Sequence, residues 1–320
     1  MPAALLYLAV GFALLYFGGE VLVRGAAGLA LRLGLTPLVV GLTVVAFGTS
    51  CPELAVSMLA ARDNLGDVAV GNVVGSNIAN IGLILALTAL VAPITINRQI
   101  MRLDLPLLLA VTIGFILMAL DAELGRIEGM ILTAMLFLYV AVVLRLARKK
   151  TLEQQELKQE AAQELPVGAP LPRQLLYIVL GVALLVGGGH AFVEGATDLA
   201  RRLNISEAVI SLTVVALGTS LPELSASLVA AARKHGDIAV GNVIGSCLFN
   251  LMSIMGLTSL AFPMKFPDIS LIDLSVMLAM TSLMLPMFAT KSRLSRFEGG
   301  LLLLIYTGYI CWLAMNPGGR

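Results

Sequence analysis

The sequence predicts an all-α polytopic membrane protein with ten transmembrane helices, arranged as two inverted five-helix repeats. Of its 320 residues, 58% are hydrophobic and only 13% are charged, which is about half the charged share of a soluble domain. Uncharged stretches that approach the ~20 residues of a membrane-spanning helix recur along the chain, and a long segment is repeated. So few charges exclude a soluble enzyme and a disordered chain. A net charge of +1 offers nucleic acid no basic surface.

Ten stretches have the length and apolar composition of a membrane helix when charged residues are allowed at their ends. We expect helices over residues 3–31, 36–61, 68–92, 103–121, 127–147, 174–201, 206–232, 238–262, 269–289 and 297–315. A polar segment, residues 148–173, separates a first five-helix repeat over 1–147 from a second over 174–320. Its first half is highly charged and its second half is rich in proline. We therefore expect a solvated linker, too short to hold a regulatory domain.

Lysine and arginine positions predict how these helices are oriented. With both termini outside, the inner loops hold 15 Lys and Arg residues and the outer loops hold 6. Loops rich in these residues stay on the cytoplasmic side. We therefore expect an integral plasma membrane protein with both termini outside and the central linker in the cytoplasm.

The internal repeat relates residues 41–80 to residues 211–250. The segments GLTVVAFGTSCPELAVSMLAARDNLGDVAVGNVVGSNIAN and SLTVVALGTSLPELSASLVAAARKHGDIAVGNVIGSCLFN are identical at 24 of 40 positions. Because five spans are an odd number, the second half enters the membrane upside down relative to the first. Inverted repeats of this kind are typical of transporters, in which the two copies exchange conformations around one central site.

Each repeat places a glutamate in the middle of a span, Glu53 in GTSCPE and Glu223 in GTSLPE, and the one other charged residue of these two spans, Glu207, lies at the start of the second. A charge at this depth costs at least ~2.5 kcal/mol, so two at matching positions predict a functional site. The proline before each glutamate kinks the helix and frees the carbonyl one turn earlier, that of Gly48 or Gly218, and the kink also perturbs the adjacent Thr49 and Thr219 carbonyls. Carbonyls, hydroxyls and carboxylates are hard oxygen ligands, which suit Na⁺ and Ca²⁺.

The next span of each repeat carries the motif GNxxGSxxxN. Its serine and second asparagine are four positions apart and share one helix face, so their oxygens could complete a coordination shell. The residues concerned are Ser76, Asn80, Ser246 and Asn250. For the first asparagines of the motif, Asn72 and Asn242, helix packing stays open as an alternative role.

Charge balance predicts ion exchange at this site. One divalent ion, or two or more monovalent ions, would neutralise two ionised glutamates, so Ca²⁺ and Na⁺ would exclude each other. A site that binds either Ca²⁺ or Na⁺ but not both, and that opens to each side of the membrane in turn, exchanges one ion for the other and is therefore an antiporter. The alternatives are exchange of Ca²⁺ for protons, a cation channel, and a membrane protein without transport. We expect no cofactor, because Ca²⁺ and Na⁺ are substrates, and the sequence leaves the oligomeric state open.

The paired segments GTSxPE and GNxxGSxxxN resemble the two α-repeats of the cation/Ca²⁺ antiporter superfamily, in its Na⁺/Ca²⁺ exchanger branch. The resemblance spans the whole chain and implies Na⁺-driven Ca²⁺ exchange, with Glu53 and Glu223 as shared ligands of both ions. The further ligands that it implies are the carbonyls of Thr49, Thr219, Ala46 and Ala216, oxygens of Ser50, Ser220, Ser76 and Ser246, and Asn80 and Asn250 beside the central position.

Two departures from relatives refine this expectation. Some relatives carry Asp at the position of Asn250, which in animal exchangers accompanies K⁺ dependence. Asn250 therefore argues against a K⁺-dependent exchanger, which is kept as an alternative. The linker lacks the Ca²⁺-sensing domains of animal exchangers, and this indicates an unregulated prokaryotic protein of the inner membrane.

Overall fold

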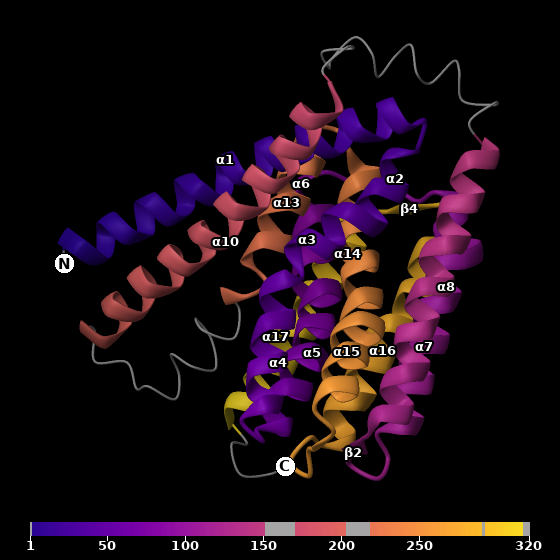
Figure 1. Cartoon of the computed structure of the whole chain (residues 1–320). Coiled ribbons are helices and arrows are strands. Elements are labelled where there is room, and N and C mark those ends of the chain that lie inside the picture. The colour runs from indigo at the N-terminus through magenta and orange to yellow at the C-terminus, as the bar shows by residue number, and fades with distance from the viewer. Residues whose placement is uncertain (1, 151–169, 203–217, 290–291, 316–320) are drawn as a thin grey trace.

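Helices make up nearly all of the chain in the computed structural model, which describes residues 2–150, 170–202, 218–289 and 292–315 (Figure 1). Among these residues, eight helices are long and apolar enough to cross a membrane: Ala3–Leu33, Gly66–Val91, Ile100–Met118, Arg126–Ala147, Leu171–Arg202, Gly236–Ala261, Leu271–Ala289 and Arg296–Met315. Pro37–Thr49 and Cys51–Arg62, bent by 45°, form a ninth if they count as one span. The protein therefore has an all-helical polytopic membrane fold. The expected span 206–232 lies partly outside the described residues, which contain its second half.

Within the described residues, the elements follow one another in matching order in both halves, except that η3 has no counterpart in the second. The first half contains α1 (Pro2–Leu33), α2 (Pro37–Val40), η1 (Gly41–Val45), α3 (Ala46–Thr49), α4 (Cys51–Arg62), α5 (Gly66–Ala79), η2 (Asn80–Leu85), α6 (Ala86–Val91), β1 (Ile94–Thr95), η3 (Ile100–Asp104), α7 (Leu105–Met118), β2 (Glu123–Leu124) and α8 (Arg126–Lys150). The second contains α10 (Leu171–Arg202), α13 (Leu221–Ala232), α14 (Gly236–Phe249), η5 (Asn250–Ile254), α15 (Met255–Ala261), β3 (Met264–Lys265), α16 (Leu271–Ala289), β4 (Arg293–Leu294) and α17 (Arg296–Met315). The η segments are π-helical turns within longer helices. Helices α8 and α10 extend a few residues into the expected linker, and the rest of it lies outside the described residues.

Two short antiparallel strand pairs relate the halves. β1 pairs with β4, with Ile94 opposite Leu294, and β2 pairs with β3, with Leu124 opposite Met264. A shift of 170 residues converts β1 into β3 and β2 into β4, so it converts one pair into the other. The pairs lie at opposite ends of the helical bundle (Figure 1), which is the arrangement that inverted repeats would produce. At the β2–β3 end, the Glu123 carboxylate pairs with Lys265 and raises the pKa of its ammonium group.

Helices α1 and α10 run side by side and oblique to the other helices (Figure 1). Glycines permit this close approach. A Cβ atom on Gly181 would lie 2.6 Å from the backbone nitrogen of Leu22, and one on Gly188 would lie 2.8 Å from that of Leu15. Any larger residue at these positions would push the two helices apart.

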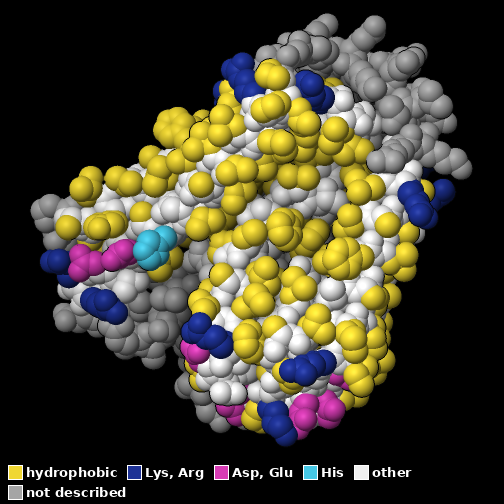
Figure 2. Space-filling model, in the orientation of Figure 1, with side chains coloured by type: hydrophobic (Ala, Val, Ile, Leu, Met, Phe, Trp, Pro, Cys, Tyr) yellow, Lys and Arg dark blue, Asp and Glu magenta, His cyan; other side chains and the backbone are white. Residues whose placement is uncertain are grey.

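The two spans that carry the GNxxGSxxxN motifs form the centre of the molecule. The apolar window of Gly236–Ala261 is 100% buried and that of Gly66–Val91 is 78% buried, against 17–44% for the other six long spans. Figure 2 shows apolar side chains over most of the visible face, with charged side chains gathered toward its ends. The polar motif residues are therefore held inside a shell of apolar helices.

Candidate ion-binding site

Two helix breaks, related by the repeat, build the site. The helix containing the first GTSxPE segment stops at Ser50, with φ −84° and ψ 3°, and restarts as α4. Ser220, with φ −89° and ψ 2°, precedes α13 in the same way. The proline two residues later lies in the first turn of each new helix, where its missing N–H leaves no helical bond unmade. The glutamate after it lies in the same turn, where the positive end of the helix favours a carboxylate.

The two glutamates are oriented by serines of the opposite half. Glu53 and Glu223 are each only 1% exposed. The Ser220 hydroxyl donates to Oε1 of Glu53 at 3.3 Å, and the Ser50 hydroxyl donates to Oε1 of Glu223 at 3.1 Å. The four side chains therefore form one buried centre with contributions from both repeats.

Among the described residues, six of the eleven buried side-chain oxygens without a hydrogen-bond partner belong to predicted ligand residues. The second carboxylate oxygen, Oε2, of each site glutamate is buried and unpartnered. The same holds for Oδ1 of Asn80, Oδ1 of Asn250, and the hydroxyls of Thr219 and Ser246. Buried polar atoms are normally hydrogen-bonded, so a group of unpartnered oxygens indicates a ligand that supplies the missing interaction.

The GNxxGSxxxN residues are buried within the central helices that pack against the broken spans. Ser76 is 5% exposed, Ser246 is fully buried, and Asn80 and Asn250 are 1% exposed. Each of the two asparagines is the first residue of a π-helical turn, η2 or η5, a feature that is frequent at functional sites. Helix α5 packs against α4, and α14 packs against α3 and α13, so both motifs face the broken spans.

The carbonyls of Ala46 and Ala216 are both predicted ion ligands, and the structure describes only the first of them. The Ala46 carbonyl accepts the Ser50 N–H at 3.0 Å and lies 3.4 Å from the Thr49 hydroxyl, so only part of its accepting capacity is open to an ion. Thr49 also donates its hydroxyl to Oδ1 of Asn242 at 3.2 Å. Ala216 lies outside the described residues.

The first asparagines of the motif support the glutamate backbones. Asn72 donates to the Glu53 carbonyl at 3.1 Å and to the Ser57 hydroxyl at 3.0 Å. Asn242 makes the related bonds, to the Glu223 carbonyl at 3.3 Å and to Ser227 at 3.0 Å. These asparagines therefore connect each broken span to the helix that follows it. They stabilise the packing of the two helices by hydrogen bonds and hold the backbone of the site glutamate.

Buried carboxylates elsewhere have neutralising or hydrogen-bonding partners. Glu20, 7% exposed, pairs with Arg233 at 2.7 Å. Asp104 is fully buried and accepts from the Tyr139 hydroxyl at 3.1 Å. The two site glutamates differ, because the described residues place no cationic side chain in a salt bridge with either of them. Two carboxylates that lack a counter-charge leave a site for cations.

The donor set defines the kind of cation. Among the described residues, no group of three or more His, Cys, Asp and Glu residues could hold a metal ion. The centre instead combines two carboxylates with hydroxyl, amide and carbonyl oxygens. Neutral and anionic oxygens without soft ligands suit hard cations such as Na⁺ and Ca²⁺.

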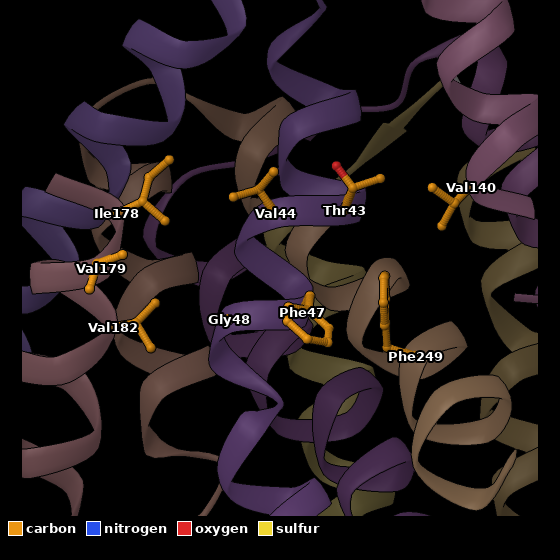
Figure 3. A pocket seen from close by; sticks show the side chains of 9 residues that line it. All are labelled: Thr43, Val44, Phe47, Gly48, Val140, Ile178, Val179, Val182 and Phe249. Carbon is orange, nitrogen blue, oxygen red and sulfur yellow. The ribbon is translucent and has the colours of Figure 1, made fainter. Parts of the chain in front are cut away.

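An apolar cavity lies beside this centre but cannot hold ions. It has a volume of about 460 Å³ and is lined by apolar surface of η1, α3, α8, α10 and α14. Figure 3 shows Phe47 and Phe249 on one side of it and Val182 on the other, next to Gly48 of the broken span. Its lining offers a cation almost no oxygen ligands.

Sequence reasoning missed Asn77, which is 2% exposed and directly bonded to Asn250. It occupies a position that the repeat does not preserve, because its equivalent is Cys247. The sequence signal was that the two repeats differ at this position directly after the shared Gly and Ser. Such a difference does not show which way the side chain points.

Each half of the chain is similar to the same family of known proteins. The family described as sodium/calcium exchanger protein matches residues 3–145 and again residues 173–315. Inner membrane protein YrbG of Escherichia coli is 36% identical, with 98% of this chain and 97% of the relative covered. Sodium/calcium exchanger MaX1 of Methanosarcina acetivorans is 31% identical, with 95% and 97% covered. The solved structure of a sodium/calcium exchanger from Methanococcus jannaschii superposes with a TM-score of 0.83 at 29% identity, over 97% of this chain and 98% of that one.

Proposed function

Because the chain belongs to the sodium/calcium exchanger protein family, a family of membrane antiporters, we propose that it exchanges Ca²⁺ for Na⁺ at the centre formed by Glu53 and Glu223. The observation that carries this proposal is the pair of buried carboxylates, each with one unpartnered oxygen and each oriented by a serine of the other half. Membership of the family supports cation/Ca²⁺ exchange. The Na⁺ coupling, the glutamate site and the mechanism are our proposals.

The charge of the site explains exchange. Two ionised glutamates are neutralised by one Ca²⁺ or by two or more Na⁺, and each species needs the same oxygens. Binding of one therefore displaces the other. A centre without its ions would carry two buried charges, whose desolvation cost is several kcal/mol per ion, and this disfavours movement of the empty site across the apolar barrier. Uncoupled leak of Ca²⁺ is suppressed for that reason.

We further propose that ten spans form two inverted five-helix repeats, 1–147 and 174–320, joined by the linker 148–173. The crosswise strand pairs at opposite ends of the bundle support this arrangement. The repeats would exchange conformations to open the centre to either side. In this arrangement both termini face outside and the linker is cytoplasmic. The inner membrane is the proposed location, in keeping with the name of the Escherichia coli relative.

The ligand set follows from the same centre. We propose the side chains of Glu53 and Glu223 as ligands of both ions. The supporting ligands are the carbonyls of Thr49, Thr219, Ala46 and Ala216 and the side-chain oxygens of Ser50, Ser220, Ser76, Ser246, Asn80 and Asn250. Unpartnered oxygens in this set support it most directly.

Flux in proteoliposomes tests the function. Vesicles loaded with Na⁺ and diluted into Na⁺-free medium should take up radioactive Ca²⁺, at equal pH on both sides and without K⁺. Vesicles loaded with choline should not. Uptake driven by a pH gradient but not by a Na⁺ gradient would replace Na⁺ with protons as the counter-ion. Uptake that continues with no counter-ion inside would contradict antiport.

Replacing Asn250 with Asp is expected to change monovalent-ion selectivity. A third carboxylate adds a charge beside the centre, so one more monovalent cation is needed for neutrality. We expect K⁺ to stimulate Na⁺-driven Ca²⁺ uptake by Asn250→Asp, where the unmodified protein shows no response. Measuring initial uptake at a series of K⁺ concentrations checks this. Identical K⁺ curves for both proteins would count against Asn250 lying at the site.

A further inference from the structure

Asn77 forms a hydrogen-bonded relay that ends at the proposed site. Its Nδ2 group donates to the Cys247 carbonyl at 3.4 Å. Its Oδ1 atom accepts from Nδ2 of Asn250 at 3.0 Å. The residue lies on α5, next to Ser76 in the sequence, and is 2% exposed. Asn77 therefore connects the two central helices at the level of the ion ligands.

The relay has only one direction. A backbone carbonyl can only accept, so the bond to Cys247 directs the NH₂ group of Asn77 toward it and leaves Oδ1 for Asn250. Asn250 must then present its NH₂ group to Asn77. Its own Oδ1 atom consequently points the other way, and that atom is buried without a partner. An amide oxygen held in this way is preorganised for a cation, whereas a flipped amide would present hydrogens to it.

The two repeats differ at this point. Asn80 is equivalent to Asn250, but the position equivalent to Asn77 is Cys247. A thiol has no amide oxygen to accept from Asn80, and the Cys247 sulfur instead lies 4.0 Å from the Asn77 carbonyl. The Asn80 Oδ1 atom is buried and unpartnered without an equivalent relay to fix its direction.

We propose that Asn77 is a positioning residue, which holds the Asn250 amide with its oxygen toward the ions and so sets the affinity for Ca²⁺. The inference rests on the proposed function, because it concerns the same site. It assigns unequal roles to two residues that the repeat makes equivalent: Asn250 is a fixed ligand, and Asn80 is free to turn. Asn77 itself touches no ion.

A double-variant cycle with Asn77→Leu and Asn250→Asp tests the proposal. Leucine fills nearly the same space as asparagine but cannot accept a hydrogen bond. Equilibrium binding of radioactive Ca²⁺ to purified full-length protein, in Na⁺-free buffer, gives the affinity of each form. We expect Asn77→Leu to weaken binding about tenfold, as for the loss of one oriented ligand. In the Asn250→Asp background we expect a change of less than about twofold, because a carboxylate presents an oxygen in either orientation.

Two further variants separate positioning from packing. Asn77→Asp retains an oxygen that accepts from Asn250, and its added negative charge can only favour a cation, so its Ca²⁺ affinity should not fall more than about threefold below that of the unmodified protein. Ile78→Ala removes a buried side chain from the same helix, so it should lower thermal stability while leaving Ca²⁺ affinity unchanged. In transport, Asn77→Leu should raise the KM for Ca²⁺ with kcat retained. Should Asn77→Leu fail to fold, Asn77→Ala takes its place in the cycle.

These measurements distinguish failure of the positioning role of Asn77 from failure of the proposed exchange function. Equal weakening by Asn77→Leu in both backgrounds, or no weakening in either, would overturn the positioning role while normal Na⁺-driven uptake by the unmodified protein upheld the exchange function. Absence of Ca²⁺ binding by the unmodified protein would overturn both. Weakening in the Asn250 background alone, with affinity kept by Asn77→Asp, would support the relay.

Discussion

Replacing either site glutamate with glutamine is expected to abolish Ca²⁺ exchange while leaving the protein folded. Glutamine keeps the size of the side chain and one oxygen, but it removes half of the charge that neutralises Ca²⁺. Loss of one buried charge from a charge-paired site costs ~2–5 kcal/mol, so Ca²⁺ affinity should fall at least about 30-fold in Glu53→Gln and Glu223→Gln. Radioactive Ca²⁺ uptake and equilibrium binding measure this directly.

The same glutamine variants should not lose stability in Ca²⁺-free buffer. Each carboxylate is 1% exposed, and removing an uncompensated buried charge relieves its desolvation cost. The unfolding temperature without Ca²⁺ should therefore hold or rise, while the stabilisation that added Ca²⁺ gives the unmodified protein should disappear. Glu194→Gln is the control, because the Glu194 side chain is 58% exposed on α10. Near-normal exchange in either site variant would refute the proposed site.

Replacing Gly245 with alanine is expected to separate the central helix from the broken span and to reduce exchange at least about tenfold. A Cβ atom at this position would lie 2.7 Å from the Leu42 carbonyl oxygen and 2.7 Å from Cβ of Ala46. The first of these is backbone, so the helices themselves must move apart. Overpacking of this kind costs ~1–3 kcal/mol, and it would displace Ser246, the next residue, from the centre.

The matched control is Gly308→Ala on α17. No described heavy atom lies within 4 Å of the Cβ that would be added there, and alanine is the better helix former by ~1 kcal/mol. Gly308→Ala should therefore keep full exchange and an equal or higher unfolding temperature. Both quantities are measured on the same purified protein. Full exchange by Gly245→Ala would show that the close helix approach is dispensable for the site.

Much of the fold and site could be predicted because both leave local or repeated signals. Apolar stretches long enough to cross a membrane mark the spans, and wherever the structure describes a helix end, the expected end lies within a few residues of it. Glu53 and Glu223 stand out because an apolar segment rarely tolerates a charge. The repeat, with its offset of 170 residues, places the two glutamates at matching positions, so each strengthens the prediction that the other is functional. These signals need no knowledge of which helices touch.

Other features could not be predicted because they depend on atoms that are distant in the chain. The proline predicts the kink in the expected span 36–61, but it does not specify that the break falls at Ser50 or that the bend is 45°. The Ala46 carbonyl is engaged within its own helix. The support of Glu53 by Asn72 requires two antiparallel helices in one register. Periodicity gives the face of a helix, and it does not give the partner of a side chain.

The sequence by itself determined that this protein is a polytopic membrane protein with a repeated pair of buried glutamates, because hydropathy and self-similarity are properties of the chain alone. Only the tertiary structure decided how that pair is used. It placed Ser50 beside Glu223 and Ser220 beside Glu53, and it made Asn250 differ from Asn80 through Asn77. The physical reason is that a hydrogen bond has a direction and a length, which both helices must satisfy together.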